Sequence, residues 1–208
     1  MQAASKLAER LRDDEVHVWM LDYQRQGGRQ PLREVLARYL GCASYEVNFA
    51  DSPSGRPTLA GPLPAPLHFN WSHSGSRALI AIARQVQPGI DLEHLQRRSR
   101  ALALARRYFA PQESRQLEGL PASAVEAAFL RLWTAKEALL KAHGSGLSFG
   151  LHRVSLVLVG EQTKIRSFEG EQIAHWQLHR LSIADGYTAA LGWRGPPLRI
   201  VRIDDLRS

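Results

Sequence analysis

Two carboxylates stand two residues apart in a short apolar stretch, Asp91 and Glu93 in "GIDLE" at 89–93. If this stretch is a strand, side chains at positions i and i+2 project to the same face. Two like charges on one face oppose each other's ionisation unless a cation lies between them. The spacing therefore predicts a cation-binding pair. The alternative is two exposed carboxylates on an edge strand, where charged side chains are common.

A second set lies in "WTAKEALLK" at 133–141, where Trp133, Glu137 and Lys141 follow one another at intervals of four. In a helix this spacing puts them on one face. Glu137 and Lys141 could be an ordinary exposed ion pair, worth about a few tenths of a kcal/mol. Leu130 and Trp133 indicate instead that the face is partly buried. A buried glutamate needs a partner, and a metal shared with the first pair would provide one.

A third set is "FNWSHSG" at 69–75, in which Ser72 and His73 end a strand-like run before a turn. Hydroxyl, imidazole and backbone N–H groups there can donate to a phosphate. The alternative is a hairpin turn with local serine hydrogen bonds. Because no Gly-x-Ser-x-Gly surrounds these serines, a hydrolase nucleophile is not indicated.

Three carboxylates without clustered cysteines favour a hard, oxygen-binding cation. Mg²⁺ is the usual one when phosphate oxygens complete its octahedron, and Mn²⁺ is the second candidate. A histidine and nearby Lys or Arg side chains would then hold a polyphosphate. The residue chemistry thus predicts Mg²⁺-assisted work on a pyrophosphate.

The composition limits the protein class. The 208 residues are 44% hydrophobic, which allows one domain or two small ones. The net charge of +7 favours acidic partners over the alternative, in which the arginines are merely solvated surface. The single cysteine, Cys42, excludes an internal disulfide and a cysteine-ligated zinc site. With no signal-peptide pattern and no apolar run near the roughly 18 residues of a membrane span, we expect a cytoplasmic protein.

The pattern of apolar residues predicts an α+β fold of two similar halves. In the first half we expect strands at 16–22, 67–72 and 77–84, a helix ending at Gly41, and a loop at 51–66. In the second we expect helices at 97–109, from Pro111 and at 122–143, then strands at 153–159, 164–168, 174–181 and 186–193. The assignment is an N-terminal half at 1–88, a connecting strand at 89–95 with metal ligands, a C-terminal half at 96–195 and a tail at 196–208. The similarity of the halves rests on few residues and could be chance.

Four motifs occur in order over about residues 29–193: "GRP" at 55–57, "FNWSHSG", "GIDLE" and "WTAKEALLKAHGSGLS" at 133–148. Together they resemble the 4′-phosphopantetheinyl transferases, of the surfactin-synthetase-activating type with two fused halves. The resemblance implies a pseudo-dimeric single chain. It also implies transfer of the phosphopantetheine arm of coenzyme A to a serine of a carrier protein in fatty-acid, polyketide or nonribosomal-peptide synthesis, with release of adenosine 3′,5′-bisphosphate.

The resemblance assigns roles to individual residues. The implied Mg²⁺ ligands are Asp91, Glu93 and Glu137, and the implied contacts to coenzyme A are Arg56, Ser72, His73, Asp91, Lys136 and Lys141. Arg56 stands where the family often has lysine near the 3′-phosphate, and arginine can bind phosphate in a bidentate way. Glu113 matches a carboxylate at a helix start near the site.

The implied chemistry uses Glu137 and Lys141. A carrier serine is a weak nucleophile and needs a base, for which Glu137 is the candidate. Mg²⁺ would neutralise charge on the leaving phosphate, and Lys141, one turn along, would donate to the leaving oxygen.

The sequence departs from the family in being short between the first strand and the first long helix. Arginines in or before that stretch could compensate, namely Arg10, Arg12, Arg25, Arg29 and Arg33. A basic segment that could dock an acidic carrier helix comprises Arg97, Arg98, Arg100, Arg106 and Arg107.

Two rival functions remain open at this point. The first is a catalytically impaired module that binds coenzyme A or a carrier protein, because of the shortened region. The second is a nucleic-acid binder, which only the charge suggests and for which recognisable motifs are missing. We expect a monomer that binds neither nucleic acid nor membrane.

Overall fold

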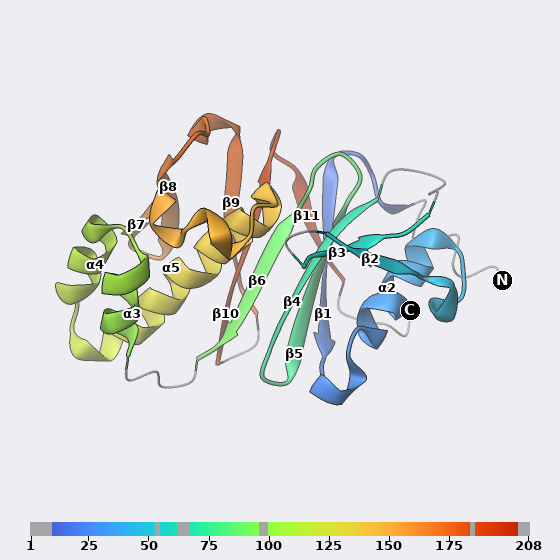
Figure 1. The fold of residues 1–208 in the computed structure, drawn as a ribbon, viewed down its shortest axis with the longest axis horizontal. Helices are drawn as coiled ribbons and strands as arrows, with labels where there is room; N and C mark the ends of the chain where they lie inside the picture. The colour runs from blue at the N-terminus through green and yellow to red at the C-terminus, as the bar shows by residue number, and fades with distance from the viewer. Residues whose placement is uncertain (1–9, 53–54, 62–66, 96–99, 184–185, 204–208) are drawn as a thin grey trace. The chain divides into compact units, whose positions relative to one another are not determined.

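The computed structural model describes residues 10–52, 55–61, 67–95, 100–183 and 186–203 (Figure 1). The chain has an α+β fold, as predicted, and divides into two compact units. Unit 1 comprises residues 1–88 and 197–208, and unit 2 comprises residues 89–196. The strand expected to connect two halves therefore belongs to unit 2.

A four-stranded sheet forms the centre of unit 1, in the order β11-β1-β5-β4. The strands are β1 (Glu15–Asp22), β4 (His68–Ser74), β5 (Arg77–Ala83) and β11 (Arg199–Ile203). Neighbours β1, β5 and β4 are antiparallel, whereas β11 runs parallel to β1. The alternating apolar pattern of β1 and β5 was sufficient to predict both strands.

Helix α2 (Gln30–Leu40) supplies the other side of the core of unit 1. It begins at Gln30, one residue before Pro31, and ends at Gly41, as predicted for its end. The φ of 67° at Gly41 is left-handed and suits glycine. Its apolar face, which includes Leu32 and Leu36, belongs to the same core as Trp19 and Ile80 of the sheet.

Two sequence expectations for unit 1 were wrong. The segment expected to be a loop, 51–66, contains β3 (Pro57–Leu59), which pairs with β2 (Phe49–Asp51) in a short hairpin. The segment expected to be a tail contains β11, which pairs with β1 from Glu15↔Arg199 to Trp19↔Ile203. A three-residue strand gives too few positions for alternation to be seen, and β11 depends on a partner distant in sequence.

The described part of unit 2 combines a three-stranded sheet, a hairpin and three α-helices. The sheet has the order β6-β10-β9, with β6 (Gly89–His94), β9 (Trp176–Leu181) and β10 (Tyr187–Arg194). The hairpin pairs β7 (Val154–Val159) with β8 (Gln162–Phe168). The helices are α3 (Ala101–Tyr108), α4 (Pro111–Glu118) and α5 (Ala122–His143).

Helix α5 lies across β6 and β10 (Figure 1). A Cβ atom on Gly89 would overlap the carbonyl oxygen of Ala138 and the amide nitrogen of Ala142. Only a glycine lets the helix backbone approach the strand this closely. Gly192, the cross-strand partner of Gly89, is similarly close to Leu139. The two glycines therefore set the distance between α5 and the strand that carries Asp91 and Glu93.

Candidate active site

The side chains of Asp91 and Lys141 meet between β6 and α5. The Lys141 ammonium donates to Asp91 Oδ1 over 2.6 Å and to the Ile90 carbonyl over 3.2 Å. Asp91 is buried, whereas about a quarter of the Lys141 side chain is exposed. In β6 the acidic residues alternate with Ile90 and Leu92, which are buried. The predicted spacing thus places Asp91 and Glu93 on one face of the strand.

Glu137, one turn before Lys141 on α5, is electrostatically coupled to this pair. Burial raises the pKa of Glu137 to about 7, with a further contribution from the negative charges of Asp91 and Glu93. The positive charge of Lys141 acts in the opposite direction. The fold therefore brings Asp91 and Glu93 close enough to influence the protonation of Glu137.

The donor set at this position fits a hard divalent cation. Three carboxylates supply only oxygen ligands, and the nearby Lys141 brings one positive charge against three negative ones. Within the described residues, however, no three His, Cys, Asp or Glu side chains are gathered as a ready-made metal site. The residue types and their mutual influence support the metal assignment, which stays a proposal.

The predicted phosphate contacts Ser72 and His73 lie on opposite faces of β4, because neighbouring strand residues alternate. Ser72 is buried and His73 is exposed. The His73 ring stacks on Tyr23 with centroids 4.4 Å apart, and the Trp71 ring lies 5.1 Å from it. The imidazole is therefore held at the surface of unit 1 by aromatic packing.

Arg56 is half-buried beside β4. Its guanidinium donates to the carbonyl oxygens of Phe69 and Pro88, the second over 3.3 Å. Burial lowers the pKa of Arg56 to about 10. Part of its donor capacity thus serves the backbone.

The structure corrects the expectation for Lys136, which has no exposed surface. Its ammonium forms an ion pair with Glu113 at 2.8 Å and donates to the carbonyl oxygens of Leu151 and Val154. Glu113 in turn accepts from the backbone N–H groups of Ala110 and Leu156, each over 2.8 Å. A phosphate cannot reach an ammonium enclosed in this way. Lys136 and Glu113 thus link α4, α5 and β7. Among the described residues, their hydrogen bonds and ion pair are made with each other and with backbone groups, and not with the Asp91–Lys141 pair.

The arginines proposed to compensate for the shortened region or to dock a carrier protein make several different contacts. Arg29 pairs with Asp51 at 2.8 Å, and Arg33 donates to the Val47 carbonyl. Arg106 pairs with Glu118 at 2.7 Å. Arg97 and Arg98 lie outside the described residues. Docking and compensation by these residues stay predictions.

One positioning residue escaped the sequence reasoning. Gly89 was noted only as the first residue of a motif, yet its missing side chain sets how closely α5 packs on β6. A glycine inside a strand pattern was the available signal, because it often marks the close approach of another backbone.

Residues 87–192 match the family model described as ACPS, the 4′-phosphopantetheinyl transferase superfamily. The chain belongs to this superfamily. The match includes Asp91, Glu93, Glu137 and Lys141, so the candidate site lies within the shared region.

Individual relatives agree with this assignment. The chain is 36% identical over 170 residues to the 4′-phosphopantetheinyl transferase HetI of Nostoc sp., covering 81% of this chain and 69% of HetI. It is 42% identical over 126 residues to slr0495 of Synechocystis sp., provisionally named a 4′-phosphopantetheinyl transferase, covering 61% of this chain and 51% of that protein. It is 36% identical to psf-1 of Bacillus pumilus, also named a 4′-phosphopantetheinyl transferase, covering 59% of this chain and 53% of that protein. The match thus spans only about half the length of two of these relatives.

Among solved structures, the holo-[acyl-carrier-protein] synthase of Thermotoga maritima aligns with 52% of this chain and 62% of its own, at 18% identity and a TM-score of 0.42. In the part of the chain that the structure describes, no helix is long and apolar enough to cross a membrane.

Proposed function

We propose that this protein transfers the 4′-phosphopantetheine arm of coenzyme A to a serine of an apo acyl or peptidyl carrier protein. The observation that carries the proposal is the approach of α5 to β6, which places Glu137 and Lys141 beside Asp91 within the region shared with the superfamily. The two units are consistent with the two-half type of transferase, which we include in the proposal.

In the proposed reaction the serine oxygen attacks the phosphorus that bears the pantetheine arm. The bond from that phosphorus to the bridging oxygen breaks, and adenosine 3′,5′-bisphosphate leaves with the bridging oxygen. The serine proton passes to Glu137. A pKa of about 7 suits a general base near neutral pH, because a fraction of Glu137 is then ionised and its carboxylate can accept the proton.

Lys141 has two tasks in this scheme. Its ammonium holds Asp91 in place, and it can donate to the phosphate oxygen on which negative charge develops. Asp91, Glu93 and Glu137 are the residues that would hold Mg²⁺ or Mn²⁺, and such a cation supplies positive charge to a pyrophosphate. From the resemblance we keep Arg56, Ser72 and His73 as candidate contacts to coenzyme A in unit 1.

The net charge of +7 supports a negatively charged partner, as a carrier protein and coenzyme A both would be. A cytoplasmic, monomeric protein without nucleic-acid binding stays our expectation from the sequence.

The test is incubation of the full chain with coenzyme A, Mg²⁺ and an apo carrier protein, with intact-protein mass spectrometry of the carrier. We expect a mass gain of one phosphopantetheine group, and none when the carrier serine is replaced by alanine. One rival from the sequence stays open, a module that binds coenzyme A or a carrier protein without catalysis. Saturable coenzyme A binding without any mass gain would select that rival.

A further inference from the structure

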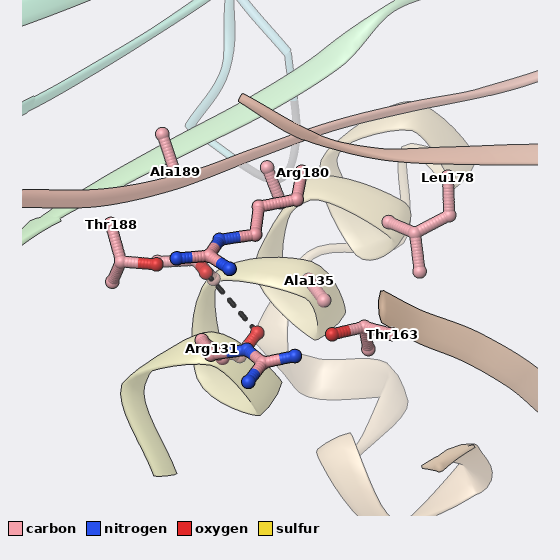
Figure 2. Close-up of a pocket in the computed structure, with 9 residues that line it drawn as sticks. Arg131, Ala135, Thr163, Leu178, Arg180, Thr188 and Ala189 are labelled. Carbon is pink, nitrogen blue, oxygen red and sulfur yellow. Dashed lines mark hydrogen bonds between the residues drawn. The ribbon is translucent and has the colours of Figure 1, made fainter. Parts of the chain in front are cut away.

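We propose that unit 2 contains an oxyanion-binding pocket, formed by Arg131, Arg180 and Thr188, which serves a ligand other than the reacting pyrophosphate. The pocket lies between α5 and strands β8, β9 and β10 (Figure 2). It accepts one oxygen of a phosphate-like or carboxylate-like anion.

The pocket is small and lined by hydroxyl and guanidinium groups. Its enclosed volume is about 10 Å³, close to the space of a single water-sized atom. The lining residues are Arg131, Thr134, Ala135, Thr163, Leu178, Arg180, Thr188, Ala189 and Ala190. Figure 2 shows the hydroxyl of Thr188 beside the guanidinium group of Arg180, with Arg131 on the side of α5. One oxygen atom fits inside, with the remainder of its group at the mouth.

Two donors in the pocket are buried without a partner among the described residues. They are the hydroxyl of Thr188, a residue that is only 5% exposed, and the Nε–H of Arg131. Buried polar groups are almost always hydrogen-bonded, because leaving one unpaired is costly. The two residues line the same cavity, and the proposal places one acceptor oxygen between their donors.

The other end of the Arg131 guanidinium is already occupied. Its Nη2 donates to the carbonyl oxygens of Gly160 and Gln162 over 3.0 and 3.3 Å. These bonds fix the group against the turn between β7 and β8. Nε–H therefore remains as the donor available to the pocket.

The charge around the pocket favours an anion over a neutral water molecule. Burial lowers the pKa of Arg131, and the positive charge of Arg180 lowers it further. The negative charge of Glu161 raises it. Glu161 pairs with Arg180 and lies 3.9 Å from Arg131, but its side chain is 82% exposed. Two guanidinium groups thus share one solvent-exposed carboxylate, which leaves one excess positive charge. An oxyanion on the inner side would neutralise it with charge-assisted hydrogen bonds.

The pocket adjoins the candidate carboxylates on the face of the sheet that α5 covers, and Arg131 lies at its end away from Glu137. Thr188 is directly opposite Glu93 in the β10–β6 register. Arg131 precedes Glu137 by six residues, which is about 9 Å along a helix. A small anion is repelled at the carboxylate end and attracted at the arginine end.

The experiment is a titration of the full chain with inorganic phosphate, without coenzyme A or divalent cations, at constant ionic strength set by chloride. The readout is the arginine Nε–H resonances in ¹⁵N NMR spectra. We expect saturable shifts of the Arg131 resonance. Thr188→Val keeps the shape of the side chain and removes its donor, so it should weaken phosphate binding at least tenfold. Thr188→Ser restores a hydroxyl and should restore binding.

Arg180→Gln should also weaken phosphate binding at least tenfold. Arg153→Gln is the matched control, because Arg153 pairs with Glu169 and does not line the pocket. We expect phosphate binding to be unchanged in this variant. Equal weakening in both variants would mean general charge attraction and would overturn the proposal. Absence of a saturable shift would show that the cavity takes only water, and would overturn it as well.

Phosphate could also bind the proposed coenzyme A contacts. In that case His73→Gln would lose the phosphate response and Thr188→Val would keep it, which would contradict the pocket. Because no transfer is measured, failure of the transferase proposal leaves this result intact.

Discussion

The carboxylate of Asp91 and the ammonium of Lys141 share a hydrogen bond of 2.6 Å, so a candidate metal ligand and a candidate phosphate contact hold each other. A cation bound at Asp91 competes with this ammonium. The two residues should therefore be energetically coupled, with opposite effects on metal affinity.

The first prediction uses Mg²⁺ titration by calorimetry in the absence of coenzyme A. Glu137→Gln removes one negative charge near Asp91 and should weaken Mg²⁺ binding by about tenfold or more. Lys141→Ala removes a competing positive charge and should leave the affinity unchanged or raise it. Equal losses in the two variants would contradict the division of roles.

The second prediction concerns turnover with an apo carrier protein. Glu137→Gln should lower kcat by about 10²-fold or more, the usual scale for losing a positioned base. Lys141→Ala should also lower kcat, because its charge matters most as the leaving phosphate becomes negative. Glu169→Gln, on the exposed surface of unit 2, is the control and should keep full activity. Normal turnover in both site variants would remove the support for the transferase assignment.

The third prediction tests the approach of α5 to β6. Gly89→Ala inserts a methyl group against the backbone of Ala138 and Ala142, which must move apart. We expect a loss of about 1–3 kcal/mol in the free energy of unfolding, as in other overpacked cores. Chemical denaturation, followed by the fluorescence of the tryptophans in unit 2, should show this loss.

Gly119→Ala is the matched control for this change. Gly119 has right-handed helical φ and ψ, and its added Cβ would only make ordinary contacts at 3.7 Å. We expect it to be neutral or slightly stabilising. A similar loss at both positions would show that the space beside Gly89 is not limiting.

The long helix and most strands could be predicted because they carry their own apolar period. The helix expected at 122–143 is α5, with the same bounds, and the strand expected at 16–22 is β1 with one further residue. The carboxylates could be predicted from two spacings, i+2 on a strand and i+4 on a helix. Each spacing fixes a face within one element, and the neighbouring elements then decide what that face contacts.

Lys136 shows where this reasoning ends. The resemblance to the family implied a phosphate contact for Lys136, but one residue along a helix from Glu137 is a rotation of about 100°. That rotation directs Lys136 into the core, where Glu113 from α4 meets it. The partner lies 23 positions earlier, and no local pattern indicates the pairing. The strand β11 was missed for the same reason, since its pairing with β1 joins the two ends of the chain.

The fourth prediction follows from the buried Lys136–Glu113 pair. Lys136→Met leaves the Glu113 carboxylate buried without its cation, and should cost about 3–5 kcal/mol of stability. Adding Glu113→Gln should recover part of this loss, because the stranded charge is removed. A double-mutant cycle by chemical denaturation measures the coupling. A raised KM for coenzyme A with unchanged stability in Lys136→Met would instead support a phosphate contact.

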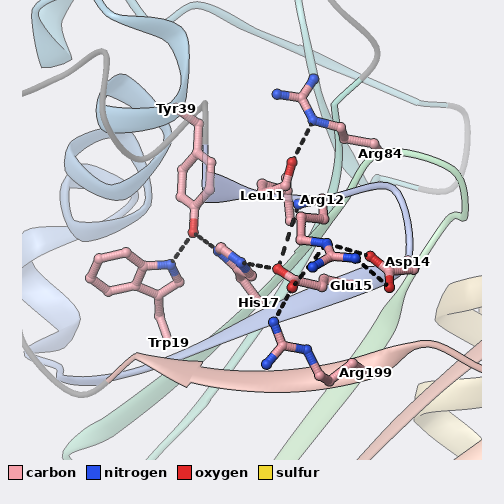
Figure 3. A network of polar contacts seen from close by, with 9 residues as sticks. All are labelled: Leu11, Arg12, Asp14, Glu15, His17, Trp19, Tyr39, Arg84 and Arg199. Carbon is pink, nitrogen blue, oxygen red and sulfur yellow. Dashed lines mark hydrogen bonds and ion pairs between the residues drawn. The ribbon is translucent and has the colours of Figure 1, made fainter.

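The fifth prediction is a loss of stability of unit 1 in acid, caused by a buried network around His17 (Figure 3). His17 Nε2 lies 3.2 Å from Glu15, Nδ1 lies 2.8 Å from the Tyr39 hydroxyl, and Trp19 Nε1–H donates to that hydroxyl over 2.8 Å. An ionised Glu15 only accepts, so neutral His17 donates from Nε2 and accepts at Nδ1 from Tyr39.

Burial lowers the pKa of His17 below 6.5, although Glu15 acts against this change. Burial also opposes ionisation of Glu15, but hydrogen bonds from Arg199, His17 and the Arg12 amide outweigh it and hold the pKa of Glu15 below 4.5. Both groups bind protons more readily when unfolded. Their stabilising effect is therefore present above pH 6.5 for His17 and above pH 4.5 for Glu15, and each is lost as the pH falls through the lowered pKa of the folded state.

Hydrogen exchange of the Trp19 indole N–H, corrected for intrinsic rates, measures this effect within unit 1. Between pH 7 and 5 the opening free energy should fall with decreasing pH, by at most about 1.4 kcal/mol per pH unit for the His17 proton. His17→Gln keeps a hydrogen-bonding side chain without a titration and should flatten this part of the profile. Its stability at pH 7 should be lower than that of the wild type, and only the slope tests the assignment. An unchanged slope in His17→Gln would show that another group titrates, and would contradict a neutral His17 in the folded network.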